Sequence, residues 1–90
     1  MSDSKFIEKA TAAVGDKHRL AILNELSRKG EICCTDAQEL TGLSQACSSH
    51  HLKQLTDSGL VTVRKAGKHH FFALNREKFA QLSQFFNALT

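Results

Sequence analysis

The sequence lacks tryptophan, tyrosine and proline, and it has only three cysteines in 90 residues. A disulfide-stapled secreted domain needs an even, spaced set of cysteines, whereas Cys33 and Cys34 are adjacent and the total is odd, so we expect a reducing, cytoplasmic environment. The densest apolar run, residues 20–23, is far shorter than the roughly 18 residues of a membrane span. The first ten residues contain no apolar segment, so we expect neither a secretory signal nor a membrane partner.

The remaining composition is that of a folded chain. Apolar residues make up 41% and charged residues 23%, which is enough apolar material to offset chain entropy. Ninety residues correspond to one domain, which we place at 1–90, and are too few for an ordinary two-domain enzyme with a cleft. So small a monomer leaves much of its surface solvated, which favours a core shared in a dimer.

The charge is unevenly distributed. Residues 1–43 carry seven acidic and six basic side chains, whereas residues 44–76 carry five basic and one acidic. Four of the five histidines also lie in the second segment. An anionic partner for residues 44–76 is therefore indicated, although a solvated face would give the same pattern.

Helical apolar spacing recurs in four stretches that each end near a glycine. It predicts helices near 4–14, 17–29, 36–41 and 45–57, followed by Gly15, Gly30, Gly42 and Gly59. Suitable N-cap residues precede each helix: Ser4, Asp16, Ser44, and Thr35, which forms a capping box with Gln38.

The pattern changes after residue 60. Residues 60–74 alternate around Ala66-Gly67, which predicts two strands and a tight turn. Asn75 then caps a last helix, 76–89, which has an apolar stripe of Phe79, Leu82, Phe85, Phe86 and Leu89. The expected fold is mainly α with a small β-hairpin, in the order of four helices, two strands and one helix.

Residues 35–58 have the pattern of a helix-turn-helix, whose second helix enters the major groove of DNA. We predict a recognition helix at about 44–57, and Gln45 at its start can pair bidentately with adenine. The hairpin, at about 61–74, is the predicted wing, with basic side chains placed for phosphates or a minor groove. The predicted DNA contacts are Ser44, Gln45, Ala46, Cys47, Ser49, His50, Lys53, Arg64, Lys65 and Lys68.

Several motifs resemble those of the ArsR/SmtB family of bacterial winged-helix repressors, from about Val14 to Leu89. Residues 15–23 are similar to the family's D-x-T-R-L-x-I-L helix, and residues 31–33 to its E-L-C motif before the third helix. Residues 43–52 resemble the recognition-helix motif L-S-Q-x-x-x-S-x-H-L. Residues 58–61, 67–68 and 71–74 look like its strand and wing.

The resemblance implies a winged helix-turn-helix homodimer that pairs through its first and last helices and represses transcription from double-stranded DNA. The recognition helices of such a dimer enter major grooves about 34 Å apart on an imperfect palindromic operator. Two positions depart from the family pattern. His50 replaces a usual arginine, which weakens one phosphate contact or makes it pH-sensitive, and Ser48 replaces a small apolar residue.

Family members leave DNA in response to metals, metalloids or thiol oxidation, depending on their ligands. The family's metalloid motif, Cys-x-Cys-x-x-Cys, falls on Cys33, Thr35 and Gln38, so two of three thiolates are missing. The zinc-type site on the last helix needs Asp, His and Glu ligands, but only Glu77 follows His70. We therefore expect no cofactor, and Cys33 and Cys34 are only weak metalloid candidates.

The adjacent thiols Cys33 and Cys34 precede a predicted helix start, where amides and the helix dipole favour thiolate, although Glu31 and Asp36 oppose it. We expect thiol chemistry there, through oxidation or reactive sulfur, to release the repressor from DNA. A buried structural role for Cys34 and a polar DNA contact for Cys47 are the simpler alternatives.

Other functions fit the sequence less well. An arsenite- or antimonite-responsive repressor would use the same cysteines. A small thiol redox protein with no role on DNA lacks Cys-x-x-Cys and a histidine–carboxylate pair to activate a nucleophile. A winged helix used only for protein contacts is a third possibility, because fold does not fix function. We do not expect an enzyme.

Overall fold

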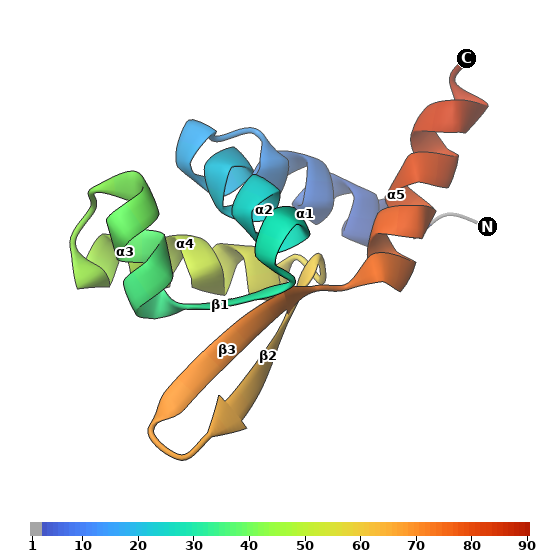
Figure 1. Ribbon diagram of the computed structural model, residues 1–90. Coiled ribbons are helices and arrows are strands. Elements are labelled where there is room, and N and C mark those ends of the chain that lie inside the picture. Colours follow the sequence, from blue (N-terminus) through green and yellow to red (C-terminus); the bar gives the residue numbers. More distant parts are fainter. Residues whose placement is uncertain (1–2) are drawn as a thin grey trace.

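The computed structural model describes residues 3–90, which form five helices and three strands (Figure 1). In chain order these are α1 (Ser4–Val14), α2 (Lys17–Lys29), β1 (Glu31–Cys33), α3 (Cys34–Thr41), α4 (Gln45–Asp57), β2 (Val61–Ala66), β3 (His69–Leu74) and α5 (Arg76–Ala88). The expected order of helices and hairpin is confirmed. None of the helices in residues 3–90 has the length and apolar character needed to cross a bilayer.

The predicted N-caps are correct for three helices and wrong for two. The side chains of Asp16, Ser44 and Asn75 accept backbone N–H bonds at the starts of α2, α4 and α5. Helix α1 is capped by Asp3 rather than Ser4, since the Asp3 carboxylate accepts from two amides of the first turn.

Helix α3 begins two residues earlier than predicted. Its N-cap is Cys33, and the Asp36 carboxylate accepts the Cys33 backbone N–H at 3.0 Å, so the proposed Thr35–Gln38 capping box is wrong. The chain is extended through Cys33 because β1 pairs antiparallel with β3, with Ile32 opposite Phe72. The strand order is β1-β3-β2, and the unexpected strand β1 places Cys33 at the edge of the sheet, with Cys34 directly after it at the start of α3.

Two apolar clusters hold the helices together. The larger one joins α2, α3, α4 and the sheet, and its largest fully buried side chains are Ile22, Leu26, Ile32, Leu52 and Leu55. The smaller one joins α1 to α5 and contains Phe6, Ile7, Ala10, Leu60 and Leu82. Part of the apolar stripe on the last helix is therefore covered within one chain.

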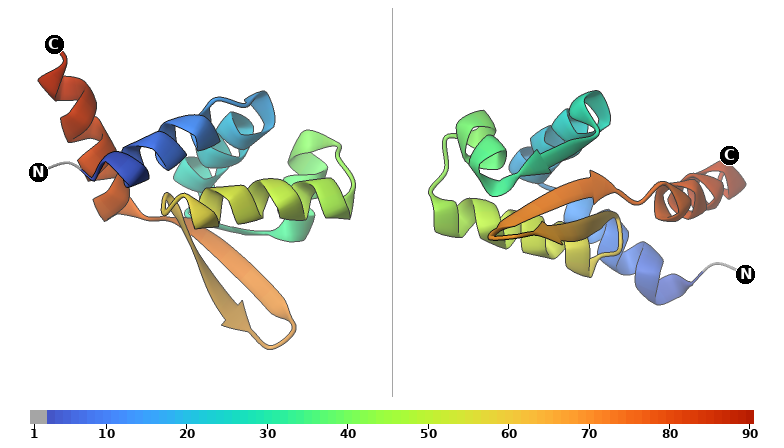
Figure 2. Two further views of the ribbon diagram at one scale, coloured as in Figure 1. Left: turned by 180° about the vertical axis from the view of Figure 1, so that it is seen from behind. Right: turned by 60° about the horizontal axis from the view of Figure 1, so that its bottom comes forward.

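Two elements project from this helical body. The β2–β3 hairpin extends away from it beside α4, and α5 begins near the base of the hairpin and projects in another direction, next to the start of α1 (Figures 1 and 2). The outer end of α5 has little of its own chain around it, since Phe86 is 48% exposed and Leu89 is 70% exposed.

Ser48 is the one fully buried polar side chain of α4, and its hydroxyl has no hydrogen-bond partner among the described residues. Replacing it by alanine should raise the free energy of unfolding by about 1 kcal/mol, because an unsatisfied buried hydroxyl is removed. Urea unfolding measures this. Ser49→Ala, at an exposed position of the same helix, controls for helix propensity and should change stability less. A loss of stability in Ser48→Ala would show that the hydroxyl has a partner.

Candidate nucleic-acid interface

The start of α4 is an exposed polar surface. Gly42 ends α3 in the left-handed region at φ 73°, which turns the chain sharply into α4. Ser44 then caps α4 by accepting the Cys47 N–H at 3.2 Å. The predicted contact residues on this helix are all exposed: Ser44, Gln45, Ala46, Cys47, Ser49, His50 and Lys53. Leu52 and Leu55 are buried against the body of the domain, which fixes the orientation of the helix.

A groove of about 680 Å³ separates α4 from the hairpin. We call it the recognition groove. Gln45, Ser49 and Lys53 line it from α4, and Lys65, Lys68, His69 and His70 line it from the hairpin. Leu52 and Phe72 form its apolar floor, and the adjacent cysteines lie at its α3 side. No Asp or Glu in residues 3–90 is among its lining residues, so the groove favours an anion.

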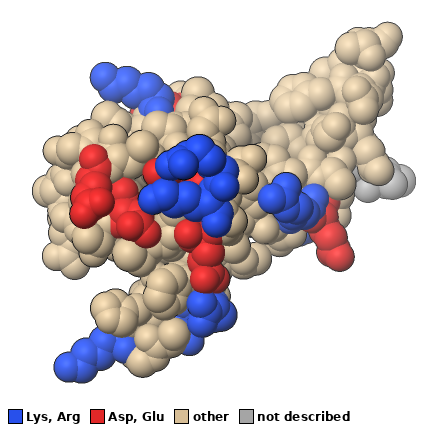
Figure 3. Space-filling model, viewed as in Figure 1, with Lys and Arg blue, Asp and Glu red and all other residues tan. Residues whose placement is uncertain are grey.

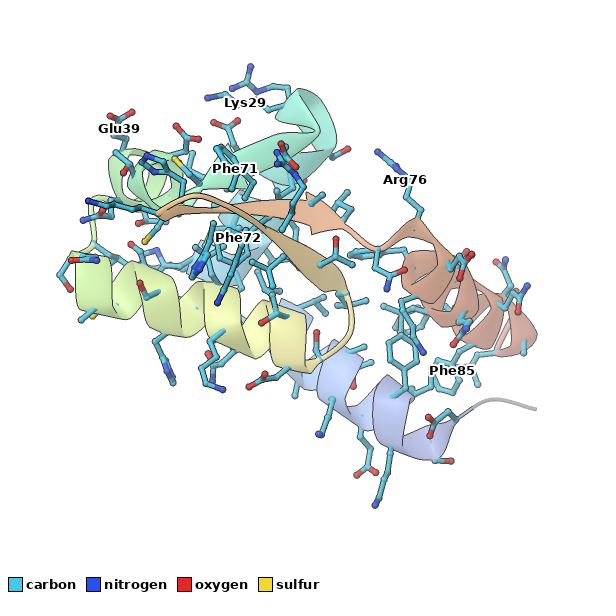
Figure 4. The ribbon with its side chains drawn as sticks, turned by 90° about the horizontal axis from the view of Figure 1, so that it is seen from below. Lys29, Glu39, Phe71, Phe72, Arg76 and Phe85 are labelled. Carbon is cyan, nitrogen blue, oxygen red and sulfur yellow. The ribbon has the colours of Figure 1, made fainter. Side chains whose placement is uncertain are left out.

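The register of the hairpin separates its basic residues. Lys65 lies opposite His70, and Val63 lies opposite Phe72, on the face toward α4. Arg64 pairs with Phe71 on the other face, and Phe71 and Phe72 point to opposite sides of the hairpin (Figure 4).

Arg64 is engaged within the chain. Its guanidinium donates to Glu31 at 2.9 Å and lies 4.9 Å from the centre of the Phe71 ring. The hydrogen bond to Glu31 raises the pKa of Arg64 above its ordinary value. The sequence grouped Arg64 with Lys65 and Lys68, whereas the structure leaves only the two lysines on the groove (Figure 3 shows the basic hairpin tip). Lys53 also lines the groove but is paired with Asp57 at 2.9 Å.

A polar network on the side of α4 away from the hairpin ties it to α2. Arg19 donates to the Ala13 carbonyl at 2.6 Å and to Nδ1 of His51 at 3.1 Å, and Gln54 accepts from the same guanidinium. Asp16, the α2 N-cap, lies 3.8 Å from His51. No local pattern in the sequence indicates these contacts of Arg19, because its partners on α4 lie more than 30 residues further along the chain.

Burial lowers the pKa of His51, and the positive charge of Arg19 lowers it further, while Asp16 acts in the opposite direction. Neutral His51 can accept the Arg19 hydrogen bond at Nδ1, whereas the protonated ring cannot. The Arg19 backbone amide lowers the pKa of Asp16, which therefore stays ionised near neutrality.

The lowered pKa of His51 predicts acid sensitivity. The unfolded chain takes up this proton near 6.5 and the folded chain only at lower pH, so the free energy of unfolding should fall as pH drops below 6.5. His51→Gln, which can still accept from Arg19, should reduce this fall, as measured by urea unfolding at pH 7.5 and 5.5. His69→Gln, on the exposed hairpin, is the control. An unchanged pH dependence in His51→Gln would contradict the assignment.

The two adjacent thiols have different surroundings. Cys33 donates from Sγ to the Asp36 carboxylate at 3.4 Å, whereas Sγ of Cys34 lies 3.4 Å from the hydroxyl of Ser49 on α4. Both cysteines are half-buried, and Cys47 is exposed and does not line the recognition groove. In residues 3–90 no three His, Cys, Asp or Glu side chains are grouped to hold a metal ion.

The chain is similar to known transcriptional repressors. A family model described as a helix-turn-helix domain matches residues 14–64. The arsenical resistance operon repressor of Staphylococcus xylosus is 44% identical over 71 residues, which cover 79% of this chain and 67% of the relative. That of Staphylococcus aureus is 41% identical over 76 residues, covering 84% and 72%.

The fold is likewise that of solved family members. The crystal structure of an ArsR family transcriptional regulator matches this chain with a TM-score of 0.88, and the match covers 99% of this chain and 92% of that one. The two sequences are 22% identical, so this match shows a similar fold alone. The family model, the two relatives and the five helices with a hairpin agree with the resemblance noted in the sequence. The chain therefore belongs to the ArsR/SmtB family of winged helix-turn-helix, DNA-binding transcriptional repressors.

Proposed function

We propose that two copies of this chain form a dimer that places one α4 in each of two successive major grooves of an imperfect palindromic operator. The observation that carries this proposal is the recognition groove, which is basic, has no Asp or Glu among its lining residues in the described part of the chain, and is bordered by the exposed start of α4. In this arrangement a phosphate backbone follows the groove and meets Lys65 and Lys68, while Gln45 and Ser49 reach base edges. Ser44, Ala46, Cys47 and His50 complete the α4 surface, and Lys53 and Arg64 contribute less because each is paired with a carboxylate.

The outer ends of α1 and α5 supply the dimer contact in this proposal. Phe86 and Leu89 are exposed, and residues 79–90 carry no charged side chain, as the uncharged outer part of α5 in Figure 3 shows. An exposed apolar helix end on a domain of this size favours a partner surface of the same kind.

Gln45 tests the assignment of base contacts. Gln45→Ala should lower the preference for operator over unrelated duplex by about 1–3 kcal/mol per contacted base pair, because a bidentate side chain is lost while phosphate contacts remain. Fluorescence anisotropy with both duplexes at one salt concentration measures the ratio. Asn24→Ala, which removes an exposed amide side chain from α2, is the matched control. An unchanged ratio in Gln45→Ala would refute the docking of α4 proposed here.

Release from DNA is proposed to occur through thiol chemistry at Cys33 and Cys34, and the contact between Cys34 and Ser49 supports it because that contact links a thiol directly to α4. Arsenite or antimonite is the second candidate inducer, favoured by the arsenical resistance repressors among the relatives. A titration of the operator complex with peroxide and with arsenite separates the two inducers. The reagent that releases the unsubstituted protein from the operator should fail to release Cys33→Ser and Cys34→Ser. Release that is unchanged in both variants would place the sensor elsewhere.

A further inference from the structure

The recognition groove brings a thiol and several cations into one space. Sγ of Cys34 lies 3.4 Å from the Ser49 hydroxyl on one wall, and Lys65, Lys68 and His70 line the hairpin wall. The pairing of Lys65 with His70 across β2 and β3 holds both on the face toward α4. Cys34 therefore lines a groove whose charged lining residues, within residues 3–90, are all basic.

We propose that Cys34 is a site of S-thiolation by small disulfides that carry carboxylates. The Cys34 thiolate attacks one sulfur of the disulfide RSSR, the S–S bond of the reagent breaks, and a mixed disulfide between Cys34 and RS forms. The other half leaves as RS⁻ and takes up a proton, so Cys34 is oxidised while half of the reagent is reduced. The role of this reaction in releasing the protein from DNA rests on the DNA-binding function proposed above.

The surroundings of the three cysteines select Cys34. At Cys33, the Asp36 carboxylate accepts a hydrogen bond from the thiol and would repel an anionic reagent. At Cys34 the neighbouring group is the Ser49 hydroxyl, which can donate to a thiolate. Cys47 is more exposed than Cys34 but lies outside the groove, so the lysines of the hairpin do not line its approach.

The adduct would act directly on DNA binding. It would occupy the groove between α4 and the hairpin, and its carboxylates would neutralise the lysines that the phosphate backbone is proposed to meet. No conformational relay between a distant sensor and α4 is required, because Cys34 already touches the recognition helix.

The reaction is tested on the full chain by mass spectrometry of its peptides after proteolytic digestion. The probes are glutathione disulfide, which is anionic, and cystamine, which is cationic. For each probe, the rate of mixed-disulfide formation at Cys34 is divided by the rate of mixed-disulfide formation at Cys47 in the same sample. At low salt this ratio should be about tenfold higher with glutathione disulfide than with cystamine. The double variant Lys65→Gln/Lys68→Gln should remove most of that difference. Equal ratios for the two reagents, or a difference that survives the double variant, would overturn the proposal.

The effect on DNA is a separate readout. The unsubstituted chain and Cys34→Ser are each compared before and after treatment with glutathione disulfide. In the unsubstituted chain, the mixed disulfide at Cys34 should lower the affinity for duplex DNA at least tenfold, and dithiothreitol should restore it. Cys34→Ser treated with glutathione disulfide should show no such loss. Modified protein that binds DNA normally would refute the occlusion. Unmodified protein that fails to bind duplex DNA would instead refute the proposed function, and the rates at Cys34 would still decide whether the groove selects anionic disulfides.

Discussion

Replacing Lys65 and Lys68 together by glutamine is expected to weaken binding to every duplex by roughly 10²- to 10³-fold at 0.1 M salt. Both lysines line the recognition groove, and neither forms an ion pair among the described residues. A dimer would lose four phosphate contacts, so the slope of log affinity against log salt should fall by about 3.6. Fluorescence anisotropy over a series of salt concentrations measures both quantities.

Lys29→Gln is the matched control for this double variant. Lys29 lies on α2, is paired with Glu25 at 3.6 Å and does not line the groove, so its removal should leave the salt slope nearly unchanged. If the double variant keeps the wild-type slope, the hairpin does not contact phosphates and the proposed path of the backbone is wrong.

Replacing Leu55 by alanine is expected to lower the free energy of unfolding by about 2–5 kcal/mol, because the side chain is fully buried and its loss leaves a cavity. A chain of 90 residues has a total stability of roughly 0.05–0.15 kcal/mol per residue, so this one change removes much of it. Leu55 lies in the larger apolar cluster and holds α4 on the body of the domain. Urea unfolding followed by circular dichroism measures the change.

Leu40→Ala provides the comparison for Leu55→Ala. Leu40 belongs to the neighbouring helix α3 but is 40% exposed, so the same truncation should cost less than about 1 kcal/mol. Equal losses in the two variants would mean that α4 is not anchored through Leu55.

The sequence predicted those parts of the fold that depend on local patterns. Asp16, Ser44 and Asn75 cap their helices as expected, since an N-cap is decided within a few residues of the chain. The predicted start of α3 was wrong because the pairing of Ile32 with Phe72 keeps the chain extended up to Cys33. That pairing joins residues 40 positions apart, and a three-residue strand is too short to show a periodic pattern.

The candidate site was predictable in its location but not in its contacts. The helix-turn-helix pattern correctly indicated which helix presents an exposed polar start. The ion pair between Arg64 and Glu31 and the contact of Cys34 with Ser49 both arise from the sheet and helix packing. Alternation within the hairpin places Arg64 and Lys65 on opposite faces, but which face turns toward α4 depends on Phe72 entering the core.

The central claim, that a dimer of this chain binds duplex DNA through α4 and the hairpin, is tested most directly by sedimentation of the protein with a fluorescent duplex from its own upstream region. At about 50 mM salt we predict two chains per operator site, with an affinity well above that for unrelated duplex and falling steeply as salt increases. A protein that sediments as a monomer and leaves both duplexes free at this ionic strength would contradict the account.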